Sequence, residues 1–301
     1  MSFPSFTDVG KPCNDLLKKD FPVGTVKVEG KFRTTNGVNF TTTAVRNNKD
    51  YSYSFDHEGK YAHKPLGLTL TLGVSSANLV TAKAELLDQL ARGLKTDVQA
   101  QVLTTSLTTN VRVSSEFKRS FLASSFKSGA AIVARGNADI HKGPLLSGDV
   151  AVSANNVVAG IEGAYDVQEK VVKRAAYVLG YINPEYKVSL HLLNGGKLCS
   201  LAYHHRVSRD VEAAVNTTLN PLGTSSLGDV SAEMGLKYVL DPATFVKAKL
   251  DTQGRLGLGY TQILRPGVKL SLGSVVETGK LAATAVDANN IKFGTAFVIE
   301  G

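Results

Sequence analysis

The residues from 254 to 273 alternate in character at every second position, in two runs that flank Pro266-Gly267. In the first run, Leu and Tyr alternate with Gly and Thr; in the second, Val and Leu alternate with Lys, Ser and Gly. A period of two is typical of a β-strand, and a Pro-Gly pair supplies the fixed φ and the positive φ of a type II turn. This stretch therefore predicts an antiparallel β-hairpin, and the same unit recurs along almost the whole chain.

The two faces of these runs differ in polarity. One face is apolar and the other is charged or small and polar; between residues 246 and 251, Val, Ala and Leu alternate with Lys, Lys and Asp. A soluble β-sandwich produces the same alternation, so periodicity alone leaves soluble and membrane folds open. Short turns, many strands and a lack of helices to cover an open sheet favour a closed barrel, and closure is obligatory in lipid.

Residues 5–19 predict the one helix outside the hairpins. Ser5 or Thr7 is suited to cap it, and Pro12 is tolerated only near its start. Pro22 and Gly24 end it before the first strand. The apolar residues share one helical face, on which Cys13 is expected to pack against the barrel wall: Phe6, Val9, Cys13, Leu16 and Leu17.

Composition limits the class of protein. Apolar residues make up 43% of the chain, yet no run of about 18 strongly apolar residues predicts a membrane-spanning helix. The start of the chain lacks the regions of a signal peptide, so none is expected. Two cysteines are too few for a disulfide framework or a cysteine metal site. The formal charge of +8 is scattered, which favours a general preference for anions and argues against a nucleic-acid partner.

No motif of covalent catalysis or cofactor binding stands out. Gly257 and Gly259 lack the third glycine and the following helix of a dinucleotide loop, because the sequence after them continues a strand. His204 and His205 point to opposite faces of a strand and so do not bind one ion together. Ser, His and Asp occur without a nucleophile elbow. We therefore expect no enzymatic activity, no metal and no cofactor.

Four stretches of the chain share their sequence and order with one known family. They are Phe6-Thr7-Asp8-Val9-Gly10-Lys11 with residues 15–19, the Gly-Leu-Lys element within residues 88–95, residues 256–262 followed by 265–270, and residues 292–299. The last stretch resembles the mitochondrial outer-membrane sorting signal, with Lys292, Gly294, Phe297 and Ile299 at its polar, glycine and apolar positions. Together the four stretches resemble the voltage-dependent anion channels, the mitochondrial porins.

The resemblance implies an all-β fold: a transmembrane antiparallel β-barrel of about nineteen strands, the first and last parallel, with the N-terminal amphipathic helix in the pore. It divides the chain into a helix and hinge at residues 1–22 and a barrel at residues 23–301. With that number of strands, the alternating runs are assigned near residues 24–34, 37–46, 50–57, 66–75, 78–86, 93–104, 107–118, 128–139, 145–155, 157–167, 171–182, 186–194, 197–207, 211–220, 228–240, 244–252, 255–264, 267–277 and 290–300.

The implied function is a voltage-gated, weakly anion-selective diffusion channel of the mitochondrial outer membrane that passes ions and small metabolites such as ATP and ADP. The implied partners are membrane lipid, nucleotides and small anions in the pore, further copies of the chain, and docked kinases or apoptosis regulators. Two alternatives stay open from the sequence: a protein-import pore of the same barrel family, and a soluble all-β binding protein.

The residues expected to act face the pore. The cations predicted to set anion selectivity are Lys11, Lys19, Lys27, Lys31, Arg33, Lys95, Lys187, Lys247, Lys249 and Lys269. By resemblance, nucleotides contact Lys11, Lys19, Arg255, Leu256, Gly257, Gly273, Ser274, Val275, Val276 and Glu277. The chain also departs from the family. Residues 21–24 hold one glycine where members often have a glycine-rich hinge, and Leu72 stands where some members have a lipid-facing acid, so no role of that acid is transferred.

Overall fold

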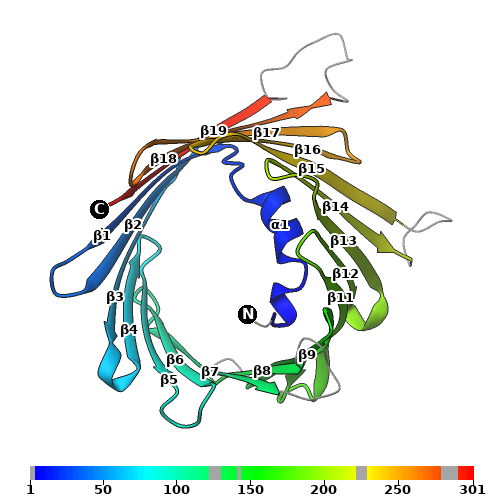
Figure 1. Ribbon diagram of the computed structural model, residues 1–301. Helices are drawn as coiled ribbons and strands as arrows, with labels where there is room; N and C mark the ends of the chain where they lie inside the picture. Colours follow the sequence, from blue (N-terminus) through cyan, green and yellow to red (C-terminus); the bar gives the residue numbers. More distant parts are fainter. Residues whose placement is uncertain (1–3, 122–129, 141–143, 222–228, 279–290) are drawn as a thin grey trace.

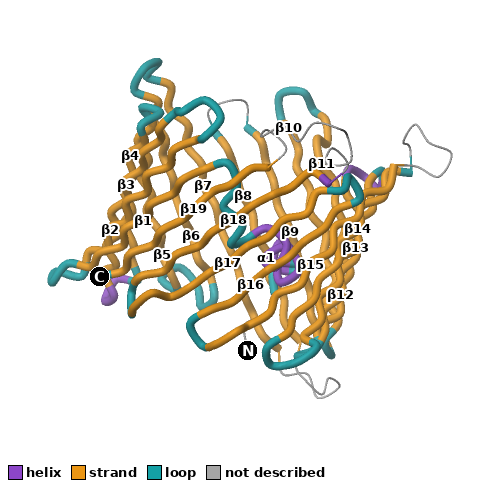
Figure 2. Tube along the Cα trace, turned by 90° about the horizontal axis from the view of Figure 1, so that it is seen from above, coloured by secondary structure: helices purple, strands orange, loops and turns teal. Residues whose placement is uncertain are grey.

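The computed structural model describes residues 4–121, 130–140, 144–221, 229–278 and 291–301. Nineteen β-strands follow one another around a closed ring, and α1 lies inside the ring (Figure 1). The strands run obliquely across the wall (Figure 2). The structure therefore confirms a closed barrel with an N-terminal helix in its interior.

Where the connections between strands lie wholly within the described residues, they are short. Their bounds are β1 Thr25–Arg33, β2 Val38–Asn47, β3 Tyr53–His63, β4 Leu68–Ser75, β5 Leu79–Leu87, β6 Leu94–Leu103, β7 Thr108–Phe121, β8 Ala130–Asp139, β9 Leu145–Ala154, β10 Val157–Asp166, β11 Val171–Ile182, β12 Tyr186–Leu193, β13 Leu198–Arg206, β14 Val211–Asn220, β15 Asp229–Asp241, β16 Thr244–Asp251, β17 Arg255–Arg265, β18 Val268–Glu277 and β19 Ile291–Glu300. The helical elements are η1 Phe6–Asp8, α1 Lys11–Lys18, η2 Lys64–Leu66 and η3 Asn194–Gly196, where η marks a short 3-10 helix.

The ring closes through a parallel pair of strands. Strands adjacent in sequence pair antiparallel, and β1 pairs parallel with β19 from Val26 opposite Thr295 to Lys31 opposite Glu300. Because successive strands reverse direction, an odd number makes the first and last strands run the same way. Closure leaves no edge strand with unpaired backbone groups facing lipid, and it confirms the predicted parallel seam.

The observed strand bounds match the predicted ones to within three residues at each end, with one exception. The third strand was expected at residues 50–57, and this is wrong because β3 extends to His63. The charged sequence around Glu58 and Lys60 looks like a turn. In the barrel both side chains face the interior, so the strand continues with its charges in contact with water. The first residues of the eighth, fifteenth and nineteenth predicted strands (128–129, 228 and 290) lie outside the described residues.

The outward side of the wall is apolar. Large outward side chains are more than one-third exposed on strands all round the barrel, among them Val28, Phe32, Phe55, Leu70, Val98, Tyr177, Leu179, Leu201, Met234, Leu236 and Leu258. Leu72, at the position of the family's lipid-facing acid, is 65% exposed. A soluble sandwich would enclose this face, whereas here it surrounds the molecule as a membrane barrel requires. The arrangement contradicts the soluble alternative.

The N-terminal segment is not one continuous helix, so the prediction of a helix over residues 5–19 is wrong. Gly10 has a φ of +86°, a left-handed conformation that ends η1 and allows α1 to begin at Lys11. Pro12 then lies in the first turn of α1, where its missing N–H costs nothing. The predicted apolar face is confirmed, because all five of its residues are buried against the wall: Phe6, Val9, Cys13, Leu16 and Leu17.

Three glycines on neighbouring strands let the segment after α1 lie directly on the wall. Gly259, Gly273 and Gly294 stand opposite one another in the register of β17, β18 and β19. A Cβ on Gly273 or Gly294 would lie 2.4 or 2.5 Å from the carbonyl oxygen of Pro22, and one on Gly259 would lie 2.8 Å from that of Asp20. The glycine-rich character of the last hairpins therefore has a packing reason.

We expect Gly273→Ala to displace residues 20–22 from the wall, because the new Cβ collides with the backbone of Pro22. The strands of the barrel should stay paired. Limited proteolysis of the refolded protein should cut between α1 and β1 faster than in the wild type, while thermal loss of strand signal stays unchanged. Gly73→Ala is the matched control, since its Cβ also faces the lumen but meets nothing closer than 3.8 Å. Equal protection of both variants would contradict the packing argument.

Candidate functional site

The wall of the barrel surrounds the N-terminal segment (Figure 1). Contacts with this segment identify which side chains of the wall point inward: Lys247 and Lys269 bind Asp20, and Arg135 binds Thr7. Alternation assigns the same face to every second residue of each strand. By this register, the predicted selectivity cations on the strands face the lumen: Lys27, Lys31, Arg33, Lys95, Lys187, Lys247, Lys249 and Lys269. Lys11 and Lys19 lie on the N-terminal segment itself.

Most of these cations have an acidic neighbour. The nitrogen-to-oxygen distances are 3.4 Å for Lys11–Asp8, 2.8 Å for Lys19–Asp15, 2.6 Å for Lys27–Glu29, 2.7 Å for Lys31–Glu300, 3.3 Å for Lys95–Glu85 and 2.9 Å for Lys249–Glu233. Such partly exposed pairs stabilise by roughly 0–1 kcal/mol each, so the lysines exchange partners easily. Arg33 and Lys187 have no ion-pair partner within the described ranges.

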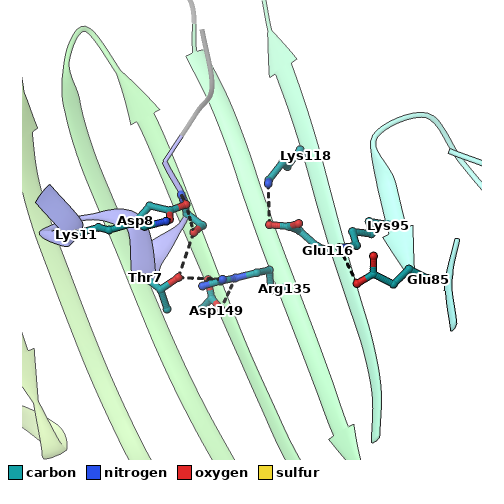
Figure 3. Close-up of polar contacts among 10 residues, drawn as sticks. Thr7, Asp8, Lys11, Glu85, Lys95, Glu116, Lys118, Arg135 and Asp149 are labelled. Atoms are coloured by element: carbon teal, nitrogen blue, oxygen red, sulfur yellow. Dashed lines mark hydrogen bonds and ion pairs between the residues drawn. The ribbon is translucent and has the colours of Figure 1, made fainter. Parts of the chain in front are cut away.

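Sequence reasoning missed the acids and several cations of the same face. Together with the predicted Lys95 they form an alternating row across β5 to β9: Lys83, Glu85, Asp97, Arg112, Glu116, Lys118, Arg135, Asp139 and Asp149. Part of this row lines a hollow of about 420 Å³: Lys83, Lys95, Asp97, Arg112, Glu116, Arg135 and Asp139. Figure 3 shows Glu85 beside Lys95 and Glu116 beside Lys118. The missed residues occupy the same alternate strand positions as the predicted cations. The period of two in the sequence was therefore sufficient to assign them to the lumen face.

One end of the N-terminal segment is held through Arg135 (Figure 3). The Arg135 guanidinium donates to both oxygens of Asp149, at 3.0 and 3.1 Å from Nε and 3.0 Å from Nη2, and its Nη1 donates to Thr7 Oγ1 at 3.0 Å. Asp149 is only 7% exposed, and Arg135 is its ion-pair partner. Within η1, the Ser5 hydroxyl donates to the Asp8 carboxylate at 2.6 Å and closes the turn.

The other end is held through Asp20, which sequence reasoning did not select. Lys269 Nζ lies 2.8 Å from one carboxylate oxygen of Asp20, and Lys247 Nζ lies 3.0 Å from the other. Burial alone would raise the pKa of Asp20, but hydrogen bonds and attraction from the two lysines hold that pKa below its ordinary value. Asp20 is therefore charged at neutral pH, and two of the predicted selectivity cations share its single negative charge.

Residues predicted to contact nucleotides do not form one surface. On β17 and β18, Arg255, Gly257, Gly273, Val275 and Glu277 face the lumen, whereas Leu256, Ser274 and Val276 face outward. Pro22 covers Gly273, and the Lys249 side chain covers Gly257. In β19, Lys292 and Gly294 face the lumen, and Phe297 and Ile299 face outward. The nucleotide-binding and sorting roles of these residues stay predictions.

Cys13 packs against the wall as predicted. Its Sγ donates to the Val215 carbonyl at 3.4 Å, and burial raises the pKa of the thiol to about 11. Among the described residues, no group of three or more His, Cys, Asp or Glu is arranged to hold a metal ion. The helices in the described part of the chain are too short and too polar to cross a membrane.

A closed barrel with a polar lumen and an internal N-terminal segment matches one family of known proteins. The family model described as eukaryotic porin matches residues 3–287. The chain belongs to the eukaryotic porin family. It is 34% identical to the mitochondrial outer membrane protein porin of Neurospora crassa over the whole length of both chains.

Two further relatives extend the match to other organisms. The non-selective voltage-gated ion channel 1 of Saccharomyces cerevisiae is 32% identical over 94% of this chain and 95% of its own. The non-selective voltage-gated ion channel VDAC2 of Mesocricetus auratus is 28% identical over 99% of this chain and 94% of its own. This eukaryotic porin is a voltage-gated channel of the mitochondrial outer membrane, and these relatives give no support to the import-pore alternative.

We expect Arg135→Gln to destabilise the folded barrel by about 3 kcal/mol, because it leaves the enclosed Asp149 charge without a partner. Urea unfolding in detergent, followed by strand signal, measures the loss. The double variant Arg135→Gln/Asp149→Asn should recover most of it. Arg112→Gln removes the more exposed pair with Asp139 and should cost less than about 1 kcal/mol. Equal losses for the two single variants would contradict this account.

Proposed function

We propose that this porin is weakly anion-selective and passes small ions and nucleotides such as ATP and ADP by diffusion, without covalent chemistry. The observation that carries the proposal is a row of cations on the lumen face of β1. Lys27, Lys31 and Arg33 stand there at alternate positions with one acid of the same strand, Glu29, between them. Positive potential on a narrow, water-filled wall raises the local concentration of anions.

The pairing of the other lumen charges explains why the preference is weak. Lysines elsewhere on the wall alternate with acids at distances of 2.6–3.7 Å, so their fields largely cancel a few ångströms away. Selectivity then depends on places where cations outnumber the close acids, as on β1, where Lys27, Lys31 and Arg33 outnumber Glu29 and Glu300. Lys187 and Arg33 are the two members of the predicted set with no such partner in the described residues.

Two exposed lysines of the helix support the passage of nucleotides. The side chains of Lys11 and Lys19 are 58% and 63% exposed inside the barrel, and each holds only a local pair with an acid of the N-terminal segment. A passing phosphate can replace that acid at little cost, because exposed pairs contribute roughly 0–1 kcal/mol. Contact of nucleotides with the last hairpins, self-association, and docking of kinases or apoptosis regulators stay predictions of the resemblance.

Charge reversal of the β1 row tests the proposal. We expect the triple variant Lys27→Glu, Lys31→Glu, Arg33→Glu to shift the reversal potential across a salt gradient toward cation preference in planar bilayers. Uptake of ATP into liposomes that contain the variant should fall with it. The matched control reverses Lys49, Lys64 and Lys197, which lie in the connections between strands and give the same change in total charge. An unchanged reversal potential in the β1 variant, or an equal shift in the control, would overturn the proposal.

A further inference from the structure

Asp20 occupies a backbone conformation that few residues other than glycine adopt. Its φ is +65°, in the left-handed region, directly after the last turn of α1. For a residue other than glycine, this left-handed conformation costs of order 1 kcal/mol, which contacts with the surrounding structure have to compensate. A freely turning hinge would have glycine at this position. This chain has an aspartate there, followed by residues 21–24, which hold a single glycine.

The side chain of Asp20 is clamped between two strands of the wall. Lys247 of β16 and Lys269 of β18 each donate to a different carboxylate oxygen, at 3.0 and 2.8 Å. Lys247 is 6% exposed, and its Nζ also donates to the carbonyls of Asp15 and Lys19 at 3.3 and 3.1 Å. A lysine that caps the last carbonyls of a helix complements its negative C-terminal end.

The backbone that follows Asp20 also packs directly against the wall. Phe21 and Pro22 lie over Gly259, Gly273 and Gly294, where no Cβ would fit. The ammonium of Lys249 lies 5.0 Å from the centre of the Phe21 ring, within the range of a cation–π contact. Ion pairs, carbonyl caps and close packing thus act together at this end of the segment.

The opposite end of the segment is held less firmly by polar contacts. There, among the described residues, the Arg135 guanidinium donates to the neutral Thr7 hydroxyl, and the His191 ring is hydrogen-bonded to the Val9 backbone. The charged partner of Arg135 is Asp149, which belongs to the wall itself. At the Asp20 end, two lysines form ion pairs in which donor and acceptor are both charged, and Lys247 adds two bonds to carbonyls, so the Asp20 end is the stronger polar anchor.

We propose that Asp20 is a positioning residue of this channel: by binding Lys247 and Lys269, it holds the C-terminal end of α1 on the wall and so sets the voltage at which the channel closes. The N-terminal segment carries charges that respond to the membrane potential, among them Lys11, Asp15 and Lys19. If the C-terminal end of α1 moves away from the wall, the contacts of Asp20 with Lys247 and Lys269 have to break. Lys247 then loses its partners, and both lysines become exposed to the lumen.

Single-channel and multichannel recordings of Asp20→Asn test the proposal. The variant keeps the shape of the side chain and removes its charge, and we expect the ratio of closed to open channels at a fixed voltage to rise about tenfold, equivalent to about 1.4 kcal/mol. The reversal potential should also shift toward anions, because Lys247 and Lys269 lose their counter-charge. Asp20→Glu, which retains the charge, should restore much of the wild-type closing voltage.

Asp15→Asn is the matched control. It removes the same charge from the same N-terminal segment, but the Asp15 side chain pairs with exposed Lys19 and not with the wall. A nitroxide label at position 18, with Cys13 and Cys199 replaced by Ser, should become more mobile in Asp20→Asn and not in Asp15→Asn. Equal closing voltages in the two variants, or a loss of thermal stability in Asp20→Asn without any change in closing voltage, would overturn the proposal.

Discussion

Lipid offers no hydrogen bonds, so every backbone N–H and C=O of a membrane strand has to find its partner on a neighbouring strand. In this chain the requirement is met all the way round, because β1 pairs in parallel with β19 over six register positions. An open sheet of the same strands would expose two unpaired edges to hydrocarbon. The parallel seam therefore decides the fold, and the division of each strand into an outward apolar face and an inward polar face follows from it.

Closure also creates the surface on which the N-terminal segment rests. The lumen face is polar nearly everywhere, yet along β9 to β15 small residues such as Ala151, Ala176 and Ala214 provide an apolar strip for Phe6, Val9 and Leu17. Glycines on β17 to β19 continue the strip and bring the backbone into direct contact with Pro22. Charged side chains hold the two ends, so the segment is positioned inside the channel while its exposed lysines stay in contact with water.

Periodicity was sufficient to predict the strands because every strand separates lipid from water, and the two environments select opposite side chains. It did less well where local signals were ambiguous. The charged residues Glu58 and Lys60 are typical of a turn, and only the structure shows that they face the lumen from within β3. The left-handed φ of Gly10 interrupts the helix without changing the period of the apolar residues. The anchors were beyond sequence reasoning, because Asp20 and Lys247 are 227 residues apart and meet only when the ring closes.

The central claim, that each strand has one face in lipid and the other in a water-filled lumen, is tested most directly by cysteine scanning of β6 in liposomes. Single cysteines at residues 95–102, in protein with Cys13 and Cys199 replaced, are treated with a membrane-impermeant thiol reagent from both sides. The account predicts rapid labelling at 95, 97, 99 and 101 and little at 96, 98, 100 and 102. Uniform labelling, or a period other than two, would contradict it.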